Sequence, residues 1–198
     1  MKEKIIEKAN NMFLNLGFKS VTMDDLASEM GISKKTIYTH FQNKTKLVEA
    51  TTEHIFCTIS DGIDTILEEK KEPIEELYAI KAFVMHHLKN EKTSPQYQLQ
   101  KYYPKIHSAL KFKQFEVMQE CVIENIRRGI DKGVFRKNID VEIISRLYFM
   151  GITGIKDQEL FPVTMFPISK LMGDYLEYHV RGIATDKGLH ILNNLLKE

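Results

Sequence analysis

Four lysines, arranged in two pairs, carry the clearest chemical signature in this chain of 198 residues. Lys34 and Lys35 follow a serine, and Lys44 and Lys46 follow an asparagine. Serine and asparagine are favoured N-caps, so each pair is predicted to lie in the first turn of a helix. A cation there opposes the helix macrodipole by about 0.3–1 kcal/mol at an exposed site, whereas a phosphate anion is favoured. The two pairs therefore predict contacts with a nucleic-acid backbone; the alternative is a solvated charged face.

The segment from residue 22 to residue 47 is predicted to hold these lysines on two short helices joined by a tight turn. Apolar residues at 23, 26, 27 and 30 form one face of the first helix. Thr22 can cap that helix, with Asp25 reaching back in a short version of the capping box. Gly31 supplies the positive φ that ends it, and Ser33 caps the second helix. The small residue, turn glycine and buried anchor of a helix-turn-helix are Ala27, Gly31 and Ile37.

The distribution of charge supports a nucleic-acid partner, although the net charge of +1 does not. Residues 1–46 contain eight lysines and five acidic residues, whereas residues 47–198 contain 20 basic and 22 acidic residues. A basic N-terminal segment on a slightly acidic remainder is typical of a DNA-binding head joined to a body with another task.

The N-terminal quarter of the chain resembles the DNA-binding domain of TetR/AcrR-family transcriptional regulators. The matching residues are Ala9, Phe13, Gly17, Thr22, Leu26, Ala27, Gly31, Ile32, Ser33, Thr36, Tyr38, His40, Phe41, Lys44 and Leu47. The segment KGVFRKNID at 132–140 resembles a junction often seen late in the family's regulatory domain. Family members usually carry one or two acidic residues between the Lys44 and Leu47 positions, where this chain has Thr45 and Lys46. That departure weakens the cap and favours phosphate binding.

The resemblance implies a role for the exposed residues of the helix pair. The second helix is the recognition helix, whose exposed side enters the major groove, and the residues implied there are Lys34, Lys35, Thr36 and Tyr38. Phosphate contacts, which fix the register without reading the sequence, are implied for Thr22, His40 and Lys44. Ser33 completes the DNA-binding set as the cap of the recognition helix. Ile37 and Phe41 are predicted to be core residues instead.

The rest of the chain keeps a helical periodicity, so we predict an all-α fold with nine or ten helices. One long helix is predicted from Asn43 to about Glu69. The signals that bound the later helices are Pro73, Pro95, Pro104, Gly133 and Asp140. The predicted domains are a helix-turn-helix DNA-binding domain over residues 1–46 and a helical regulatory, ligand-binding and dimerisation domain over residues 47–198.

Other kinds of site find little support in the sequence. His86 and His87 are adjacent, so on a helix they point about 100° apart and cannot chelate one ion together. Cys57 and Cys121 are too few and too far apart to indicate a disulfide scaffold or a zinc site. No nucleophile elbow or Gly-rich phosphate loop occurs, and no apolar run approaches the roughly 18 residues of a membrane span. We predict a cytoplasmic, non-enzymatic protein that needs no cofactor or metal.

Large aromatic and sulfur-containing side chains between residues 50 and 155 predict an enclosed, mostly apolar pocket. Tyrosines crowd the segment from Pro95 to Pro104, beside the polar break KNEKTS at 89–94. Several buried tyrosine hydroxyls together can line a cavity with a few polar handles. The predicted ligand-binding residues are Tyr97, Tyr102, Tyr103, Phe112, Phe115, Met118 and Tyr148. The expected ligand is small, largely apolar, and neutral or weakly charged; the alternative is that these residues are plain core.

The segment VEIISRLYFMGITGI at 141–155 is apolar on nearly every side, which predicts burial on both faces. Gly151 and Gly154 lie about one turn apart, and such small residues let another backbone approach closely. With a helix near 168–182, this segment predicts a four-helix contact across a two-fold axis. The predicted interface residues are Ile144, Tyr148, Gly151, Ile155, Leu171, Tyr175 and Tyr178.

Together, the residues and the resemblance predict a ligand-responsive transcriptional regulator, a repressor that binds a palindromic operator as a homodimer. The resemblance implies that a small apolar effector binds the C-terminal body and changes the separation of the two heads. The alternative is an architectural or ligand-independent DNA-binding protein, which would keep the basic head but need no pocket in its body.

Overall fold

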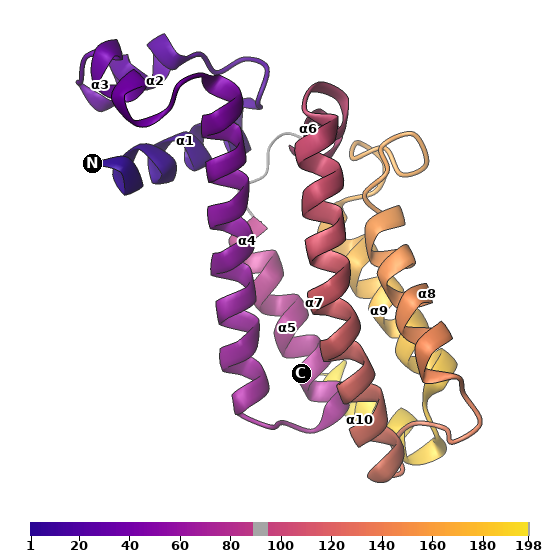
Figure 1. The fold of residues 1–198 in the computed structure, drawn as a ribbon. Helices are drawn as coiled ribbons and strands as arrows, with labels where there is room; N and C mark the ends of the chain where they lie inside the picture. The colour runs from indigo at the N-terminus through magenta and orange to yellow at the C-terminus, as the bar shows by residue number, and fades with distance from the viewer. Residues whose placement is uncertain (89–94, 198) are drawn as a thin grey trace. The chain divides into compact units, whose positions relative to one another are not determined.

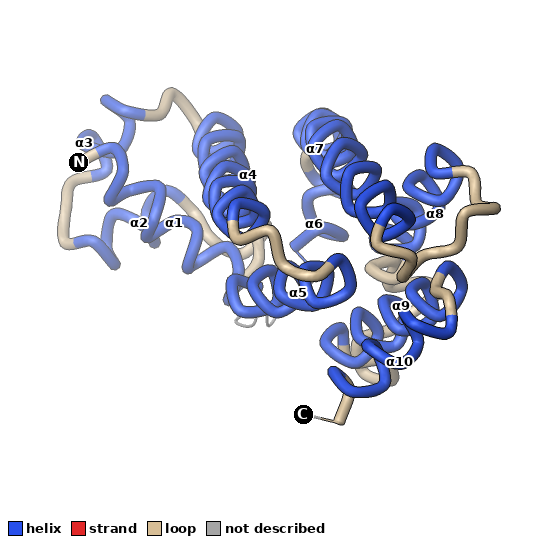
Figure 2. Tube along the Cα trace, turned by 90° about the horizontal axis from the view of Figure 1, so that it is seen from below, coloured by secondary structure: helices blue, strands red, loops and turns tan. Residues whose placement is uncertain are grey.

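The computed structural model describes residues 1–88 and 95–197, and helices make up most of both ranges (Figure 1; Figure 2). The helices are α1 (Lys2–Leu16), α2 (Met23–Met30), α3 (Lys34–His40), α4 (Lys44–Glu68), α5 (Pro73–Leu88), α6 (Pro95–Tyr102), α7 (Pro104–Asp131), α8 (Val141–Gly154), α9 (Ile168–Ile183) and α10 (Asp186–Leu195). Within these ranges there is no β-strand, and an isolated antiparallel bridge joins Phe135 to Ala184. The predicted all-α fold is therefore confirmed.

The chain forms two compact units. Unit 1 consists of Met1–Ser60 and His87–Lys113, and unit 2 consists of Asp61–His86 and Gln114–Glu198. Each unit has its own cluster of buried apolar side chains. The predicted domain division at residues 46 and 47 stays a prediction, and the polar break at 89–94 lies outside the described residues.

The core of unit 1 joins the three N-terminal helices to the beginning of α4. Ile5 and Phe13 of α1, Leu26 of α2, Ile37 of α3 and Leu47 of α4 are all at most 1% exposed. Helix α6 adds Leu99, which is 3% exposed in the same cluster, and Tyr103, Ile106 and Leu110 pack against it. The N-terminal head therefore has a core that includes a segment from the middle of the chain, a contribution that was not predicted from the sequence.

Local capping fixes the ends of the short helices as predicted. Thr22 and Asp25 form a complete capping box at α2, and Gly31 ends α2 with a φ of 62°. The Ser33 side chain accepts from the backbone N–H of Thr36 at the start of α3. At the start of α8, the Asp140 side chain accepts in the same way from Ile143. Each of these side-chain caps joins residues three positions apart, so they could be predicted from local sequence.

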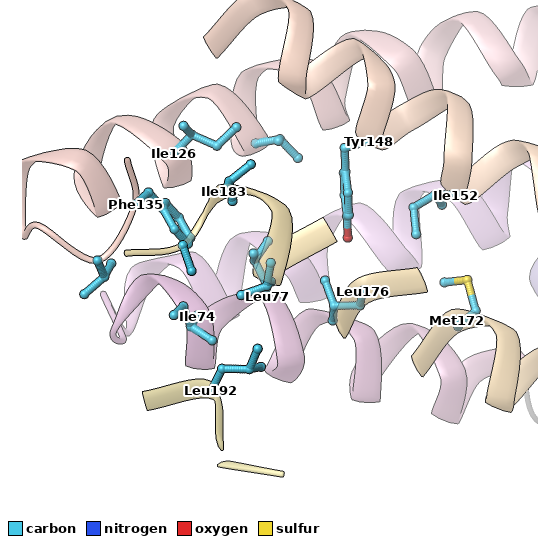
Figure 3. Packing of buried hydrophobic residues seen from close by; sticks show 14 of the residues in the cluster. Ile74, Leu77, Ile126, Phe135, Tyr148, Ile152, Met172, Leu176, Ile183 and Leu192 are labelled. Carbon is cyan, nitrogen blue, oxygen red and sulfur yellow. The ribbon is translucent and has the colours of Figure 1, made fainter. Parts of the chain in front are cut away.

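The core of unit 2 is built from α5, α7, α8, α9 and α10 (Figure 3). Its buried side chains include Ile74, Leu77, Ile126, Phe135, Tyr148, Ile152, Leu176, Ile183 and Leu192. Phe135 is fully buried, and a Cβ atom added at Gly129 would lie 2.0 Å from its ring. The turn that follows α7 contains Gly133 at a φ of 71°, which agrees with its predicted role in ending that helix.

Gly151 of α8 differs from its expected use. A Cβ atom added there would lie 2.1 Å from the ring of Tyr175, and the Tyr175 hydroxyl donates to the carbonyl oxygen of Leu147 at 3.0 Å. The glycine therefore accommodates an aromatic side chain of α9 in the same chain, and not the close approach of another backbone that was predicted. A Cβ atom at Gly154 would meet no atom within 4 Å, so no close approach is made there.

A buried ion pair joins α5 to α7 within unit 2. The carboxylate of Glu76 is fully buried and pairs with the guanidinium of Arg128, which is 26% exposed. Asn125 donates from Nδ2 to Glu76 Oε1 at 2.8 Å and to the carbonyl oxygen of Pro73 at 2.9 Å. A carboxylate without water around it depends on these partners, because the protein interior solvates charge poorly.

We predict that Arg128→Met lowers the free energy of unfolding by about 3–5 kcal/mol, because it leaves the Glu76 charge buried without its cation. Urea unfolding followed by circular dichroism measures the change. The double variant Glu76→Gln/Arg128→Met should recover most of the loss, since it removes both charges. A single variant as stable as the wild type would show that the pair does not support unit 2.

Candidate nucleic-acid interface

Helix α3 is held by its buried side and presents the opposite side to solvent. Ile37 is fully buried and Phe41, which follows the helix, is 4% exposed, so both are core residues as predicted. Lys34, Lys35 and Tyr38 are exposed on the same helix, with Tyr38 at 43%. The predicted recognition residues therefore lie where a partner can contact them, with the exception of Thr36, which is half-buried.

The hydroxyl groups of Thr22 and Ser33 are already engaged in caps. The Thr22 hydroxyl accepts from the backbone N–H of Asp25 at 3.1 Å and donates to Asp25 Oδ2 at 2.8 Å. Hydrogen bonds from the Thr22 backbone N–H and hydroxyl lower the pKa of the Asp25 carboxyl. Ser33 Oγ accepts from the backbone N–H of Thr36 at 3.1 Å. A phosphate contact through the Thr22 hydroxyl would compete with its hydrogen bond to Asp25, whereas the Ser33 cap uses the hydroxyl oxygen only as an acceptor.

The four predicted lysines have different electrostatic surroundings. Lys34 pairs with Asp24 at 2.7 Å and Lys46 pairs with Glu49 at 2.6 Å, so their charges are partly neutralised. The ammonium of Lys44 donates instead to the carbonyl oxygen of Lys19 at 3.4 Å. Burial lowers the pKa of Lys44, which the nearby Asp25 opposes. The ammonium of Lys44 is therefore partly desolvated and bonded to a neutral carbonyl oxygen. A phosphate would supply a negatively charged acceptor for it at the start of α4.

The predicted ligand-binding residues are divided between the two units. Tyr97, Tyr102, Tyr103 and Phe112 belong to unit 1, whereas Phe115, Met118 and Tyr148 belong to unit 2. Tyr97 and Tyr102 are each 39% exposed and Phe112 is 62% exposed, so these three are not enclosed within their own unit. Phe115 packs edge-on against Phe149, with 5.2 Å between the ring centroids, and Met118 packs against the core.

Most of the predicted interface residues face the interior of unit 2. Tyr148 and Ile155 are buried, and Ile144, Leu171 and Tyr175 pack against the core. Tyr178 of α9 is 74% exposed. The exposed apolar side of α8 is formed by three residues outside the predicted set, Ile143, Leu147 and Met150. When a helix is apolar on nearly every side, the spacing of its apolar residues does not show which side is buried.

A cluster of polar aromatic groups lies inside unit 2. The ring of His179 lies 4.6 Å from that of Tyr148 and 6.3 Å from that of Tyr175, between centroids. Burial lowers the pKa of His179 to about 4, so its ring is neutral at pH 7. Burial also raises the pKa of Tyr78 to about 12, and its hydroxyl oxygen has no hydrogen-bond partner among the described residues. The aromatic groups themselves are uncharged at pH 7 and incompletely hydrogen-bonded, and the ammonium of Lys81 lies 5.2 Å from the ring centroid of Tyr78.

Residues of α6 were missed as candidates for contact with a nucleic acid. Residues 95–113 contain four lysines and no acidic residue, which was a visible signal in the sequence. The structure places the α6 part of this segment in unit 1, beside the loop that joins α1 to α2.

Neither a metal site nor a membrane-spanning helix is found in the described residues. Among residues 1–88 and 95–197, no three His, Cys, Asp or Glu side chains are grouped so as to hold a metal ion. Over the same ranges, the helices are too short or too polar for any of them to span a bilayer.

Comparison with known proteins agrees with the geometry of the helix pair. Residues 5–51 match the family model described as "Bacterial regulatory proteins, tetR family". The chain is 26% identical over 140 residues to the negative transcriptional regulator IcaR of the biofilm operon icaADBC from Staphylococcus epidermidis, covering 58% of this chain and 76% of that protein. It is 20% identical over 194 residues to the transcriptional repressor KstR2 of Mycolicibacterium smegmatis, covering 94% and 92%.

Solved structures share the whole fold. A transcriptional regulator from Cytophaga hutchinsonii superposes with a TM-score of 0.73 at 21% identity, covering 92% of this chain and 98% of that one. A putative transcriptional regulator from Saccharomonospora viridis, solved in complex with choline, has a TM-score of 0.76 at 19% identity, covering 93% and 97%.

Replacing Lys44 with alanine should weaken binding to duplex DNA of every sequence, because a phosphate contact carries no sequence information. The slope of log K against log salt concentration should become shallower by about 0.9. Fluorescence anisotropy between about 50 and 200 mM salt measures that slope. Lys170→Ala in unit 2 is the control and should leave the slope unchanged. An equal slope for Lys44→Ala and the wild type would remove Lys44 from the interface.

Proposed function

This chain belongs to the TetR family of DNA-binding transcriptional regulators, and from that premise we propose that it is a homodimeric repressor released from its operator by a small molecule. The family consists of regulators that bind DNA and are not enzymes. The relatives named above include a negative regulator and a repressor, which supports the proposed sign of regulation. A regulator of this kind acts where the chromosome is, so we propose a cytoplasmic location.

The observation that carries the proposal is the presentation of α3. A fully buried Ile37 holds this short helix, while Lys35 and Tyr38 are exposed on it without belonging to the core. A side chain must be free of the protein core to reach base edges in the major groove. The exposed side of α3 therefore suits base contacts, and Lys44 suits the flanking phosphate.

Sequencing the genomic fragments that the purified protein retains tests the proposal. We expect enrichment of an inverted repeat that overlaps promoters, with half-sites about 34–36 Å apart or a multiple of that distance. Retention of fragments that share no motif would contradict sequence-specific regulation and favour the architectural alternative.

The proposed dimer uses the outward side of α8. Ile143, Leu147 and Met150 follow one another at intervals of four and three residues, so they share one side of the helix, and each is about half exposed or more. Tyr178 adds a large exposed side chain on α9, and α8 packs on α9 within unit 2. Two such pairs of helices can form a four-helix contact about a two-fold axis, as proposed from the sequence, but through these residues rather than Tyr148 and Ile155.

Placing a charge in this surface should separate the dimer. We predict that Met150→Glu elutes as a folded monomer from a sizing column, because the proposed contact would bury an unpaired carboxylate next to its own symmetry mate. Leu16→Glu, at an exposed leucine of α1, is the control and should remain dimeric. A dimeric Met150→Glu would place the interface elsewhere on the chain.

The effector is proposed to bind at the polar aromatic cluster of unit 2. The unpartnered Tyr78 hydroxyl supplies a hydrogen bond, and Tyr148 and the neutral ring of His179 supply apolar surface. Buried apolar walls with few polar groups suit a neutral, largely apolar molecule that carries at least one hydrogen-bonding atom. Met118, which packs against the same core, adds an adaptable side chain.

A thermal-shift screen of neutral hydrophobic compounds tests for the effector. Compounds that raise the melting temperature should also release the retained DNA, and their stabilising effect should shrink in Tyr78→Phe, which removes one hydroxyl and no carbon. Tyr97→Phe, at an exposed tyrosine of α6, is the matched control. A regulator that binds its operator and that no compound stabilises would favour the ligand-independent alternative.

A further inference from the structure

We propose that α6 extends the DNA-contacting surface of unit 1, with Lys19 and Lys101 binding the phosphate backbone of the duplex that flanks the site read by α3. This inference rests on the proposed function, because it needs the duplex to be held at the helix pair. It adds residues from outside the helix-turn-helix to the contact set.

Helix α6 is fixed to the N-terminal head by its own packing. Leu99 is buried in the core of unit 1, and the Gln98 side chain lies over Gly17, where a Cβ atom would be 2.5 Å from its Nε2. Gln98 Oε1 also accepts from the backbone N–H of Lys19 at 3.4 Å. Gly17 has a φ of 85°, which favours glycine, so the loop and the helix fit each other at this residue. The packing of Leu99 and Gln98 therefore fixes the backbone of α6, which carries Lys101, against the loop that carries Lys19.

A continuous series of contacts leads from the predicted phosphate contact to α6. The ammonium of Lys44 meets the carbonyl oxygen of Lys19 at 3.4 Å. The ammonium of Lys19 lies 5.6 Å from the ring centroid of Tyr102, and that of Lys101 lies 5.8 Å from the same centroid. Lys101 also lies 5.5 Å from the ring of Tyr97. The new surface is thus continuous with the Lys44 site.

The charges in this series remain available to an anion. Lys34, Lys46 and Lys113 are paired with carboxylates, whereas Lys19 and Lys101 lie against aromatic rings and are exposed. A cation–π contact orients an ammonium but leaves its charge unneutralised. No acidic residue occurs between residues 95 and 113.

The two ammonium groups are close enough together to contact phosphates of one strand. Because both ammonium groups lie close to the Tyr102 ring, they are at most about 11 Å apart. One strand of B-DNA carries a phosphate for every 3.4 Å or about that length of helix axis, so two ammonium groups no farther apart than about 11 Å can contact phosphates of the same strand. Duplex DNA, which the helix pair holds in the proposed complex, has the charge density to engage both lysines.

The test measures the salt dependence of binding to a 40-base-pair duplex of mixed sequence for the full-length protein. Lys19→Gln and Lys101→Gln should each make the slope of log K against log salt shallower by about 0.9, and the double variant by about 1.8. Lys101→Arg keeps the charge and should keep the wild-type slope. Lys111→Gln, at an exposed lysine of the same basic segment that none of these contacts includes, is the matched control and should also keep it.

The outcomes separate this inference from the proposed function. Wild-type slopes for Lys19→Gln and Lys101→Gln, with a shallower slope for Lys44→Ala, would overturn the role of α6 while the regulator proposal stands. Weak, salt-independent binding by the wild-type protein would overturn both. Unchanged DNA slopes with lost binding to vesicles containing phosphatidylserine would assign the surface to anionic lipid and also overturn the inference. Melting temperatures equal to that of the wild type confirm that each variant is folded.

Discussion

Helix α3 has seven residues, and a helix of that length is not stable alone in water. The proposed DNA-contacting side of α3 therefore depends on the burial of its opposite side in the core of unit 1. Ile37 provides that burial, in a cluster with side chains from α1, α2 and α4. The Ser33 cap and the Gly31 turn set where the helix begins and how it leaves α2. Because one side of α3 packs in the core, the side that carries Lys34, Lys35 and Tyr38 faces solvent.

Charge is arranged around this fixed helix. Unit 1 contains 14 lysines and 8 acidic residues, whereas unit 2 contains 14 basic and 19 acidic residues. Much of the positive excess of unit 1 comes from its second segment, His87–Lys113, rather than from the helix pair, where Asp24 and Asp25 accompany the lysines. In the proposed complex, the electrostatic attraction to DNA and the reading of its sequence would therefore come largely from different residues.

The features that sequence predicted well are those set by near neighbours. The capping box of Thr22 and Asp25 and the turn at Gly31 each involve residues a few positions apart, and the structure shows them as expected. The face of α8 was not predictable in the same way, because Leu147 and Tyr148 are both apolar and adjacent, and tertiary packing alone buries Tyr148. The place of Leu99 in the head was missed for a related reason, since the other buried side chains of that core lie about 50 residues or more away in sequence.

The central claim is that the exposed side of α3 reads bases. It is tested most directly by the ratio of dissociation constants for a scrambled duplex and for the selected inverted repeat, at one salt concentration. The wild-type ratio should be about 10³ or more. In Lys35→Ala/Tyr38→Ala it should fall by at least about tenfold, because each lost base contact removes about 1–3 kcal/mol of discrimination. A double variant that keeps the wild-type ratio would contradict base reading by α3.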